Sequence, residues 1–389
     1  MTMKILIAPS GYKESLDAVE TARAMELGVM DIRPDARVQV LPLLDGGEGF
    51  TTGLVAAVGG TVDHVEVTGP VGQPITAPIG VMVIDGIRTV VIDLASAAGL
   101  SLVPREQRNP LRTTSYGFGQ LISAALDRSP DRILIGCGDS GINDGGAGMA
   151  AALGARLLDE KGNDLGPGGG ELVKLASIDP TNLDPRLQTT AMIAALNPHN
   201  VLCGERGVAR VFGPQKGATP EQVEILAAAM DRYAAIIEPT FGVTVADHPG
   251  GGASGGVGAG LLAFCSADLR PRFDVVFTFL DIDSALEGVD LVMTGEGCLD
   301  GQTPKGKIPA EVAARAEIRG IPTIAVAGTI GRGAESNSEA CIDAWLSVAQ
   351  GPGTLDQALS NAAELVRTGT AQAIRLVDVG RRLQAARAA

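Results

Sequence analysis

Short apolar runs alternate with longer amphipathic stretches near both ends of the chain. The pattern predicts strands at residues 4–8 and 38–43, separated by an amphipathic helix over residues 16–30. Three further strands are predicted far downstream, each followed by a short loop: residues 290–293, 323–326 and 344–348. Because strands that alternate with helices usually pair in parallel, the two ends together predict one doubly wound α/β domain. Such domains bind ligands at the carboxyl ends of their strands.

The middle of the chain follows a different pattern. Two apolar runs, residues 81–84 and 89–94, flank the turn pair Asp85-Gly86 and predict a β-hairpin. A helix over residues 115–126 and a buried strand over residues 132–135 follow. We therefore expect a second α/β domain inserted into the first, which makes the first domain discontinuous. The predicted boundaries give residues 1–64 plus 266–389 for the first domain and residues 65–265 for the second, and we expect a ligand cleft between them.

Composition excludes several classes of function. The chain of 389 residues has a formal net charge of −14, and aromatic residues make up only 3% of it. Both features argue against nucleic acid as a partner, and the charge also argues against anionic membranes. No apolar run is long enough to span a bilayer, and the apolar stretch after Met1 is too short for a signal peptide. We therefore expect a cytoplasmic protein with reduced cysteines and no nucleic-acid or membrane partner.

Two glycine-rich segments imitate nucleotide-binding motifs. Residues 136–141 fit G-x-G-x-x-G after a strand, which leaves a dinucleotide-dependent oxidoreductase open as an alternative. Against this alternative, residues 143–146 (Asn-Asp-Gly-Gly) interrupt the segment where the dinucleotide-binding helix should already run. Residues 301–308 nearly complete a P-loop, but Ile308 has no hydroxyl group to offer Mg²⁺. The second segment is therefore not a P-loop, and the first remains an alternative.

Several glycine-framed loops carry the residue types that phosphoryl transfer needs. This reaction requires lysines and backbone N–H groups for phosphate oxygens, carboxylates for Mg²⁺, and a base near the acceptor hydroxyl. The loops that supply such groups contain Lys13, Asp45 with Glu48, Asn143 with Asp144, Lys216, and Glu296 with Asp300 and Lys307. These loops predict an α/β enzyme that handles a phosphorylated or anionic small molecule.

The same segments, in the same order, resemble the type I glycerate kinases. The resemblance extends from Lys4 to about Ala349 and rests on the motifs Ala8-Pro-x-x-x-Lys-Glu-Ser15, Asp45-Gly-Gly-Glu-Gly49, Asn109-Pro-x-x-Thr-Thr-Ser-Tyr-Gly117, Asn143-Asp-Gly-Gly-Ala-Gly148, Phe212-Gly-Pro-Gln-Lys-Gly-Ala218, the glycine run 250–260 and Thr294-Gly-Glu-Gly-x-x-Asp-x-Gln-Thr-x-x-Gly-Lys307. It implies a flavodoxin-like domain with an inserted α/β domain, MgATP as the phosphate donor, and D-glycerate as the acceptor that becomes 2-phosphoglycerate.

The resemblance also implies the site residues. As catalytic residues it indicates Lys13, Asp45, Asp144, Asn197, Glu296 and Asp300. As substrate-binding residues it indicates Ser10, Ser15, Ser140, Asn143, Asn200 and Lys216. For ATP it indicates Gly46, Gly47, Gly255, Gly256, Gly295 and Lys307, and for Mg²⁺ it indicates Asp45 and Glu296.

Three ligand-type loops depart from the pattern typical of this family. Ser10 stands where the family has aspartate, Asp139 and Ile142 stand where it has glycine and threonine, and Asn197 stands where it has aspartate. An asparagine keeps hydrogen bonding but loses the charge and basicity of a carboxylate. These changes leave open a different polyol acid as acceptor, or a non-catalytic binding protein that kept the fold. A homodimer is also compatible with the sequence.

Overall fold

The computed structural model describes residues 2–12, 15–349, 351 and 353–388, which form two compact units. Unit 1 comprises Met1–Asp45 and Val276–Ala389, and unit 2 comprises Gly46–Val275. The mixed α/β class and the discontinuous first unit were both predicted from the sequence, and both are confirmed.

The strands described in unit 1 form one sheet in the order β13-β12-β11-β1-β2, and every pairing in it is parallel. Counted along this unit alone, the order is 2-1-3-4-5, which is the flavodoxin-like order. The five predicted strands all occur, with these bounds: β1 (Lys4–Ile7), β2 (Arg37–Val40), β11 (Leu291–Leu299), β12 (Thr323–Ile330) and β13 (Ala344–Ser347).

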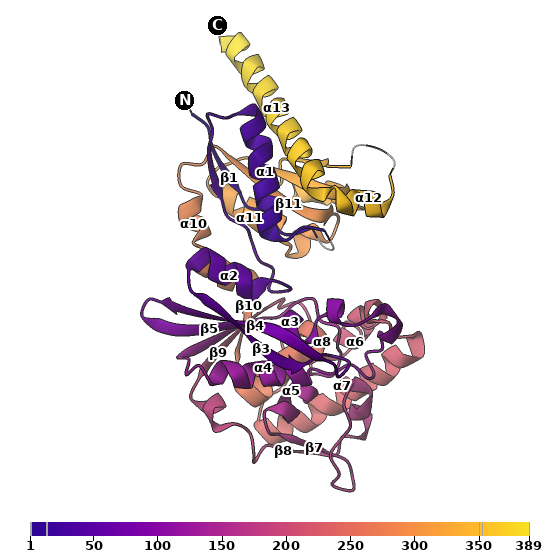
Figure 1. The fold of residues 1–389 in the computed structure, drawn as a ribbon. Coiled ribbons are helices and arrows are strands. Elements are labelled where there is room, and N and C mark those ends of the chain that lie inside the picture. The colour runs from indigo at the N-terminus through magenta and orange to yellow at the C-terminus, as the bar shows by residue number, and fades with distance from the viewer. Residues whose placement is uncertain (1, 13–14, 350, 352, 389) are drawn as a thin grey trace. The chain divides into compact units, whose positions relative to one another are not determined.

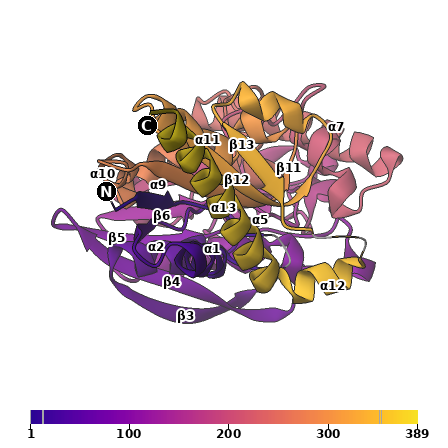
Figure 2. The same cartoon turned by 90° about the horizontal axis from the view of Figure 1, so that it is seen from above.

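Helices cover both faces of this sheet. On one face α1 (Ala18–Ile32) and α13 (Ala362–Ala388) lie side by side in both views (Figures 1 and 2). Their close approach requires Gly28, because a Cβ there would overlap the Arg367 carbonyl oxygen. Asp17 begins α1 with a capping box that includes Glu20. The opposite face packs against α11 (Ile308–Glu317), and shorter helices complete the unit: α10 (Ile282–Ala285), η6 (Thr303–Lys305), η7 (Ala334–Ser338) and α12 (Leu355–Ser360).

Unit 2 is built on a mixed sheet in the order β10-β9-β6-β5-β4-β3. Strands β5, β6, β9 and β10 are parallel, whereas β4 pairs antiparallel with β3 and with β5. The bounds of these strands are β3 (Thr61–Thr68), β4 (Pro74–Ile84), β5 (Ile87–Asp93), β6 (Arg132–Gly136), β9 (Ala191–Leu196) and β10 (Asp268–Pro271). The predicted hairpin is the β4–β5 pair, and positive φ angles at Asp85 and Gly86 make its turn.

Further helices and a small two-stranded antiparallel sheet, β7–β8, also belong to unit 2. They are α2 (Phe50–Val58), α3 (Ala95–Ala98), α4 (Tyr116–Leu126), α5 (Ala147–Ala152), β7 (Arg156–Leu158), β8 (Ser177–Asp179), α6 (Val208–Phe212), α7 (Pro220–Phe241), α8 (Ala253–Cys265) and α9 (Arg272–Leu280), the last crossing into unit 1. The main core of this unit contains the largest fully buried side chain, Tyr233 of α7.

The division between the units differs from the boundaries expected at 64/65 and 265/266. Residues 46–64 belong to unit 2 because α2 packs on β4 and β5. Residues 266–275 belong there too, because β10 pairs with β9 along Asp268–Pro271. The β10–β9 pairing joins residues that are far apart in the sequence. Residues 61–64, in contrast, belong to β3, which pairs with the next strand β4, and the expected boundary at 64/65 cut through this strand. In the part of the chain that the structure describes, no helix combines the length and apolarity that crossing a bilayer requires.

Candidate functional site

In unit 1 the strand order reverses between β1 and β11, which is where doubly wound sheets bind ligands. Strand β1 ends at Ile7, whereas β11 continues alongside β12 to Leu299. The segment after β1 follows the extended part of β11, because the backbone N–H and the hydroxyl of Ser10 both donate to the Gly295 carbonyl oxygen at 2.9 and 3.0 Å. The predicted residues Ser10, Gly295 and Glu296 therefore lie at one edge of this sheet.

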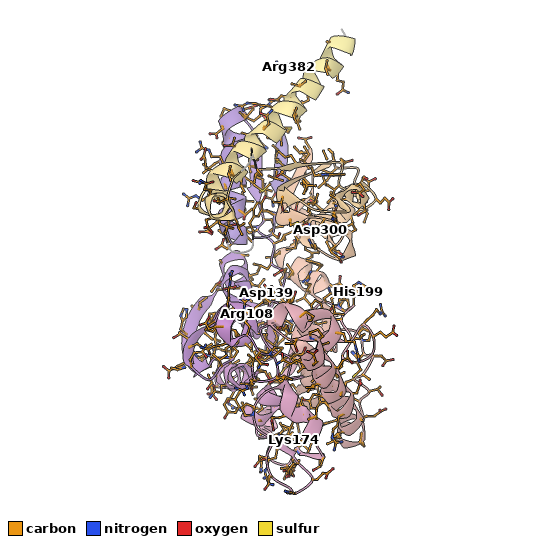
Figure 3. The ribbon with its side chains drawn as sticks, turned by 90° about the vertical axis from the view of Figure 1, so that its right-hand side faces the viewer. Arg108, Asp139, Lys174, His199, Asp300 and Arg382 are labelled. Atoms are coloured by element: carbon orange, nitrogen blue, oxygen red, sulfur yellow. The ribbon has the colours of Figure 1, made fainter. Side chains whose placement is uncertain are left out.

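Four residues at this edge form a closed ring of hydrogen bonds. The Lys307 Nζ lies 3.1 Å from Glu296 Oε2 and 3.0 Å from Asp300 Oδ1. The Thr303 hydroxyl donates to Glu296 Oε1 at 2.5 Å and accepts the Asp300 backbone N–H at 3.1 Å. Asp300, in the loop directly after β11 (Figure 3), also receives the Gln302 backbone N–H at 2.9 Å. The structure thus brings together Glu296, Asp300 and Lys307, as their spacing suggested.

The environments of the two carboxylates shift their pKa values in opposite directions. Burial raises the pKa of Glu296, although hydrogen bonds from Thr303 and Lys307 act against the rise. Asp300 is more exposed, and although burial also acts to raise its pKa, the hydrogen bonds from Gln302 and Lys307 outweigh that effect and lower it. The buried Tyr12 hydroxyl, which donates to the Val326 carbonyl oxygen at 2.7 Å, has a pKa raised by burial and by the Glu296 charge. Asp300 is therefore the more readily ionised of the two acids.

The remaining predicted residues of unit 1 are Lys13, Ser15 and Asp45. Lys13 lies outside the described residues. Ser15 makes a local turn, donating its hydroxyl to the Tyr12 carbonyl oxygen at 3.0 Å. Asp45 is half-buried and is the last residue of the first segment of unit 1. Their roles stay predictions.

In unit 2 a buried lysine ties two loops together. Lys216 follows Pro214 in a short 3-10 helix, and only 3% of it is exposed. Its Nζ donates to the Ser140 hydroxyl at 2.8 Å and to the Ile142 carbonyl oxygen at 2.6 Å. Both acceptors lie in the loop after β6, at the carboxyl edge of the parallel part of the sheet. Burial lowers the pKa of Lys216 to about 7, while the Asp144 charge acts in the other direction.

Asp144 is fully buried and accepts hydrogen bonds from several donors. Its Oδ2 receives the Ser115 backbone N–H at 2.8 Å, the Ser115 hydroxyl at 2.9 Å and the Gly148 N–H at 3.2 Å. Its Oδ1 receives the Gly146 N–H at 3.1 Å. Burial raises the pKa of Asp144, and the bonds from Ser115, Gly146 and Gly148 act against that rise. The carboxylate thereby joins the start of α4 to the start of α5.

The structure places the predicted asparagines of unit 2, and Asp139, in different surroundings. Asn143 is fully buried, and neither its side-chain oxygen nor its nitrogen has a partner among the described residues. Asn197, just after β9, accepts the His199 backbone N–H on its Oδ1 at 3.0 Å, and the Asn200 carbonyl oxygen accepts the Gly252 N–H at 3.1 Å. Asp139 is exposed (Figure 3), has a positive φ of 46° and accepts the Glu48 backbone N–H at 3.3 Å.

The glycines predicted to bind ATP are explained in the structure by close backbone packing. A Cβ at Gly255 would overlap the Ile142 carbonyl oxygen, and one at Gly295 would overlap the Val326 carbonyl oxygen. Gly46, Gly47 and Gly256 are likewise buried against neighbouring backbone. At Gly46, Gly255, Gly256 and Gly295 the protein itself occupies the space that the missing side chain leaves. The role of all five glycines toward ATP stays a prediction.

The Lys216 pKa predicts a dependence of stability on pH. Above about pH 7 the folded state releases the Lys216 proton, whereas the unfolded chain keeps it up to about 10.5, so stability should rise over this range. We expect the unfolding free energy of the wild type, relative to Lys216→Met, to increase by at least about 1 kcal/mol between about pH 6.5 and pH 9 in urea titrations. As a control, Lys174→Met removes an exposed lysine paired with Glu171 and should show no such trend (Figure 3). A constant difference would contradict the assigned pKa.

Sequence reasoning missed the residues that hold the predicted ones in place. Thr303, Tyr12 and Ser115 each bond or lie against a predicted acid, and all three are buried. The available signal was their position inside the quoted motifs, between or beside the charged residues.

Among the described residues no group of three or more His, Cys, Asp or Glu side chains is arranged to hold a metal by itself. A Mg²⁺ ion bound to Glu296 would therefore take further ligands from phosphate and water, which is usual for this ion.

A flavodoxin-like sheet with paired lysines and carboxylates at its carboxyl edge is typical of α/β enzymes that act on anionic small molecules. The chain belongs to the glycerate kinase family, whose family model matches residues 5–378. It is therefore a kinase, a phosphotransferase with an alcohol group as acceptor, and the oxidoreductase alternative is wrong.

Individual relatives match almost the whole chain. A glycerate kinase of Bacillus subtilis (strain 168) is 46% identical over 93% of this chain and 94% of its own length. A glycerate 2-kinase of Escherichia coli (strain K12) is 44% identical over 92% and 94%, respectively. A crystal structure described as that of a glycerate kinase 2 from Salmonella typhimurium LT2 is 46% identical, covers 98% of this chain and 100% of that one, and has a TM-score of 0.80.

Proposed function

We propose that this kinase transfers the γ-phosphate of MgATP to a hydroxyl of D-glycerate and forms 2-phosphoglycerate. The observation that carries the proposal is the group Glu296, Asp300 and Lys307 at the strand-order reversal of unit 1. It offers a lysine for phosphate oxygens beside two carboxylates, which are the parts that phosphoryl transfer uses. The name of the Escherichia coli relative, glycerate 2-kinase, supports the choice of product.

In this proposal Glu296 and Asp45 would hold Mg²⁺, and Lys307 would bind the phosphates of ATP. The metal would supply positive charge that neutralises the phosphate oxygens. The acceptor oxygen forms a bond to the γ-phosphorus, the bond from that phosphorus to the bridging oxygen of ADP breaks, and the hydroxyl proton passes to a carboxylate. We assign the proton to Asp300, because its pKa is lowered and its side chain is 28% exposed, whereas Asp144 is fully buried among donors.

We assign Lys216, Ser140 and Asn143 to the hydroxy acid. An ammonium group, a hydroxyl and an amide are suitable partners for a carboxylate and a neighbouring hydroxyl. The support is the unpartnered side chain of Asn143, because buried polar atoms without a hydrogen bond are rare in folded proteins.

We expect ADP release that depends on D-glycerate and on Mg²⁺. The decisive measurement combines an assay over glycerate, tartronate and erythronate with ³¹P NMR of the product. A phosphate on carbon 2 couples to one proton and gives a doublet, whereas a phosphate on carbon 3 couples to two and gives a triplet. Turnover of another acid in preference to glycerate would show that the altered loops at Ser10 and Asn197 changed the acceptor. A triplet would contradict the proposed product.

A further inference from the structure

Thr303 connects two acids of the site through a single hydroxyl group. The side chain is completely buried in the loop after β11, seven residues beyond Glu296. Its oxygen donates to Glu296 Oε1 at 2.5 Å and accepts the Asp300 N–H at 3.1 Å. One hydroxyl therefore fixes both a side-chain oxygen of Glu296 and the backbone that carries Asp300.

The second oxygen of Glu296 has a different partner. Glu296 Oε2 lies 3.1 Å from Lys307 Nζ, which is also 3.0 Å from Asp300 Oδ1 and 3.1 Å from the Cys298 carbonyl oxygen. A lysine has three N–H donors, and these three acceptors use all of them. The cation between Glu296 and Asp300 is thus the ammonium group of Lys307.

The loop backbone has further hydrogen bonds besides the one that the Thr303 hydroxyl accepts. The Thr303 backbone N–H donates to the Asp300 carbonyl oxygen at 3.1 Å, and the Lys307 N–H donates to the Thr303 carbonyl oxygen at 3.1 Å. Asn337 of η7 donates to the Asp300 carbonyl oxygen at 3.2 Å. These bonds support the loop backbone together with the Asp300 N–H bond to the hydroxyl. The Glu296 Oε1 atom, in contrast, is bonded by the Thr303 hydroxyl.

We infer that Thr303 is a positioning residue, whose hydroxyl holds one oxygen of Glu296 so that the other faces the cation position shared with Asp300. This inference rests on the proposed role of Glu296 in holding Mg²⁺. With nucleotide bound, Lys307 would bind the phosphates, and the Glu296 oxygen that it contacts at 3.1 Å would be available to Mg²⁺. Without the hydroxyl, Glu296 can rotate, and its free oxygen is no longer directed at the metal. Loss of a residue that hydrogen-bonds to a metal ligand typically lowers metal affinity or activity by about 10–100-fold.

The test compares two variants that differ in the hydroxyl. Thr303→Val keeps the shape of the side chain and removes the hydroxyl, whereas Thr303→Ser keeps the hydroxyl and removes the methyl group. We expect Thr303→Val to lower kcat by about 10–100-fold with little change in the KM for the acceptor acid, and Thr303→Ser to stay within about threefold of the wild type. Electron paramagnetic resonance of Mn²⁺ with ADP should show metal affinity at least about tenfold weaker in Thr303→Val than in Thr303→Ser.

The outcomes separate this inference from the proposed function. Equal loss in the valine and serine variants, with Mn²⁺ affinity unchanged, would show a packing role and overturn the inference. Wild-type kcat and Mn²⁺ affinity in Thr303→Val would overturn it as well. Mn²⁺ binding is measured without any acceptor acid, so a change of acceptor leaves this test intact. If Glu296→Gln retains full activity and full Mn²⁺ affinity, the proposed role of Glu296 fails, whatever the Thr303 variants show.

Discussion

Replacing Glu296 by glutamine is expected to lower kcat by about 10²–10³-fold. Glutamine keeps the size of the side chain and an oxygen that the Thr303 hydroxyl can reach, so the loop should remain folded. It removes the negative charge that Lys307 contacts at 3.1 Å and that we assign to Mg²⁺. The loss should therefore appear in catalysis and in metal affinity, with little change in the thermal midpoint.

Initial rates of ADP release at saturating ATP and acceptor measure this effect. A matched control is Glu317→Gln, which makes the same change of charge at an exposed position at the end of α11 in the same unit. We expect the control to retain wild-type kcat. Activity within twofold of the wild type in Glu296→Gln would remove this residue from the proposed chemistry and leave Asp45 and Asp300 as the remaining candidate acids of unit 1.

Replacing Asp144 by asparagine is expected to destabilise the protein by about 2–4 kcal/mol. The carboxylate is fully buried and accepts four hydrogen bonds of 2.8 to 3.2 Å, from Ser115, Gly146 and Gly148. An asparagine offers one accepting oxygen, so its NH₂ group must face a buried N–H that also needs an acceptor. The starts of α4 and α5 would both lose part of their anchoring.

Urea titrations of the wild type and the variant measure this difference. Asp164→Asn is the control, because Asp164 is exposed and pairs with Arg156, which is also exposed. Such surface pairs contribute about 0–1 kcal/mol, so the control should change stability little. An unfolding midpoint for Asp144→Asn that equals that of the control would contradict a structural role for the buried carboxylate.

The sequence predicted the strands of unit 1 because their signal is local. Each is a short apolar run followed by a glycine-containing loop, and all five strands occur where they were expected. The boundary between the two units at residues 45 and 46 could not be predicted from such a local signal. Residues 46–64 have the composition of an ordinary strand-helix connection, and their membership of unit 2 depends on packing against β4 and β5.

For the predicted site residues, too, local sequence indicated some features, whereas others depend on long-range contacts. Glu296 near the end of β11, Asp300 just after it and Lys307 at the start of α11 lie within twelve residues of sequence, so their proximity could be expected from spacing. Lys216 had the sequence features of a lysine in a surface turn, yet it is 3% exposed. Its burial arises because the loop after β6 is packed over it, and that contact joins residues 74 or more positions apart.

By itself, then, the sequence determined the family, the α/β class and the residue types at the carboxyl ends of the strands. These features follow from local periodicity and from motifs that are read in order along the chain. The tertiary structure decided which charges are buried, which oxygen of Glu296 faces Lys307, and that Thr303 holds the other. Those features depend on distances between loops, and long-range packing sets such distances.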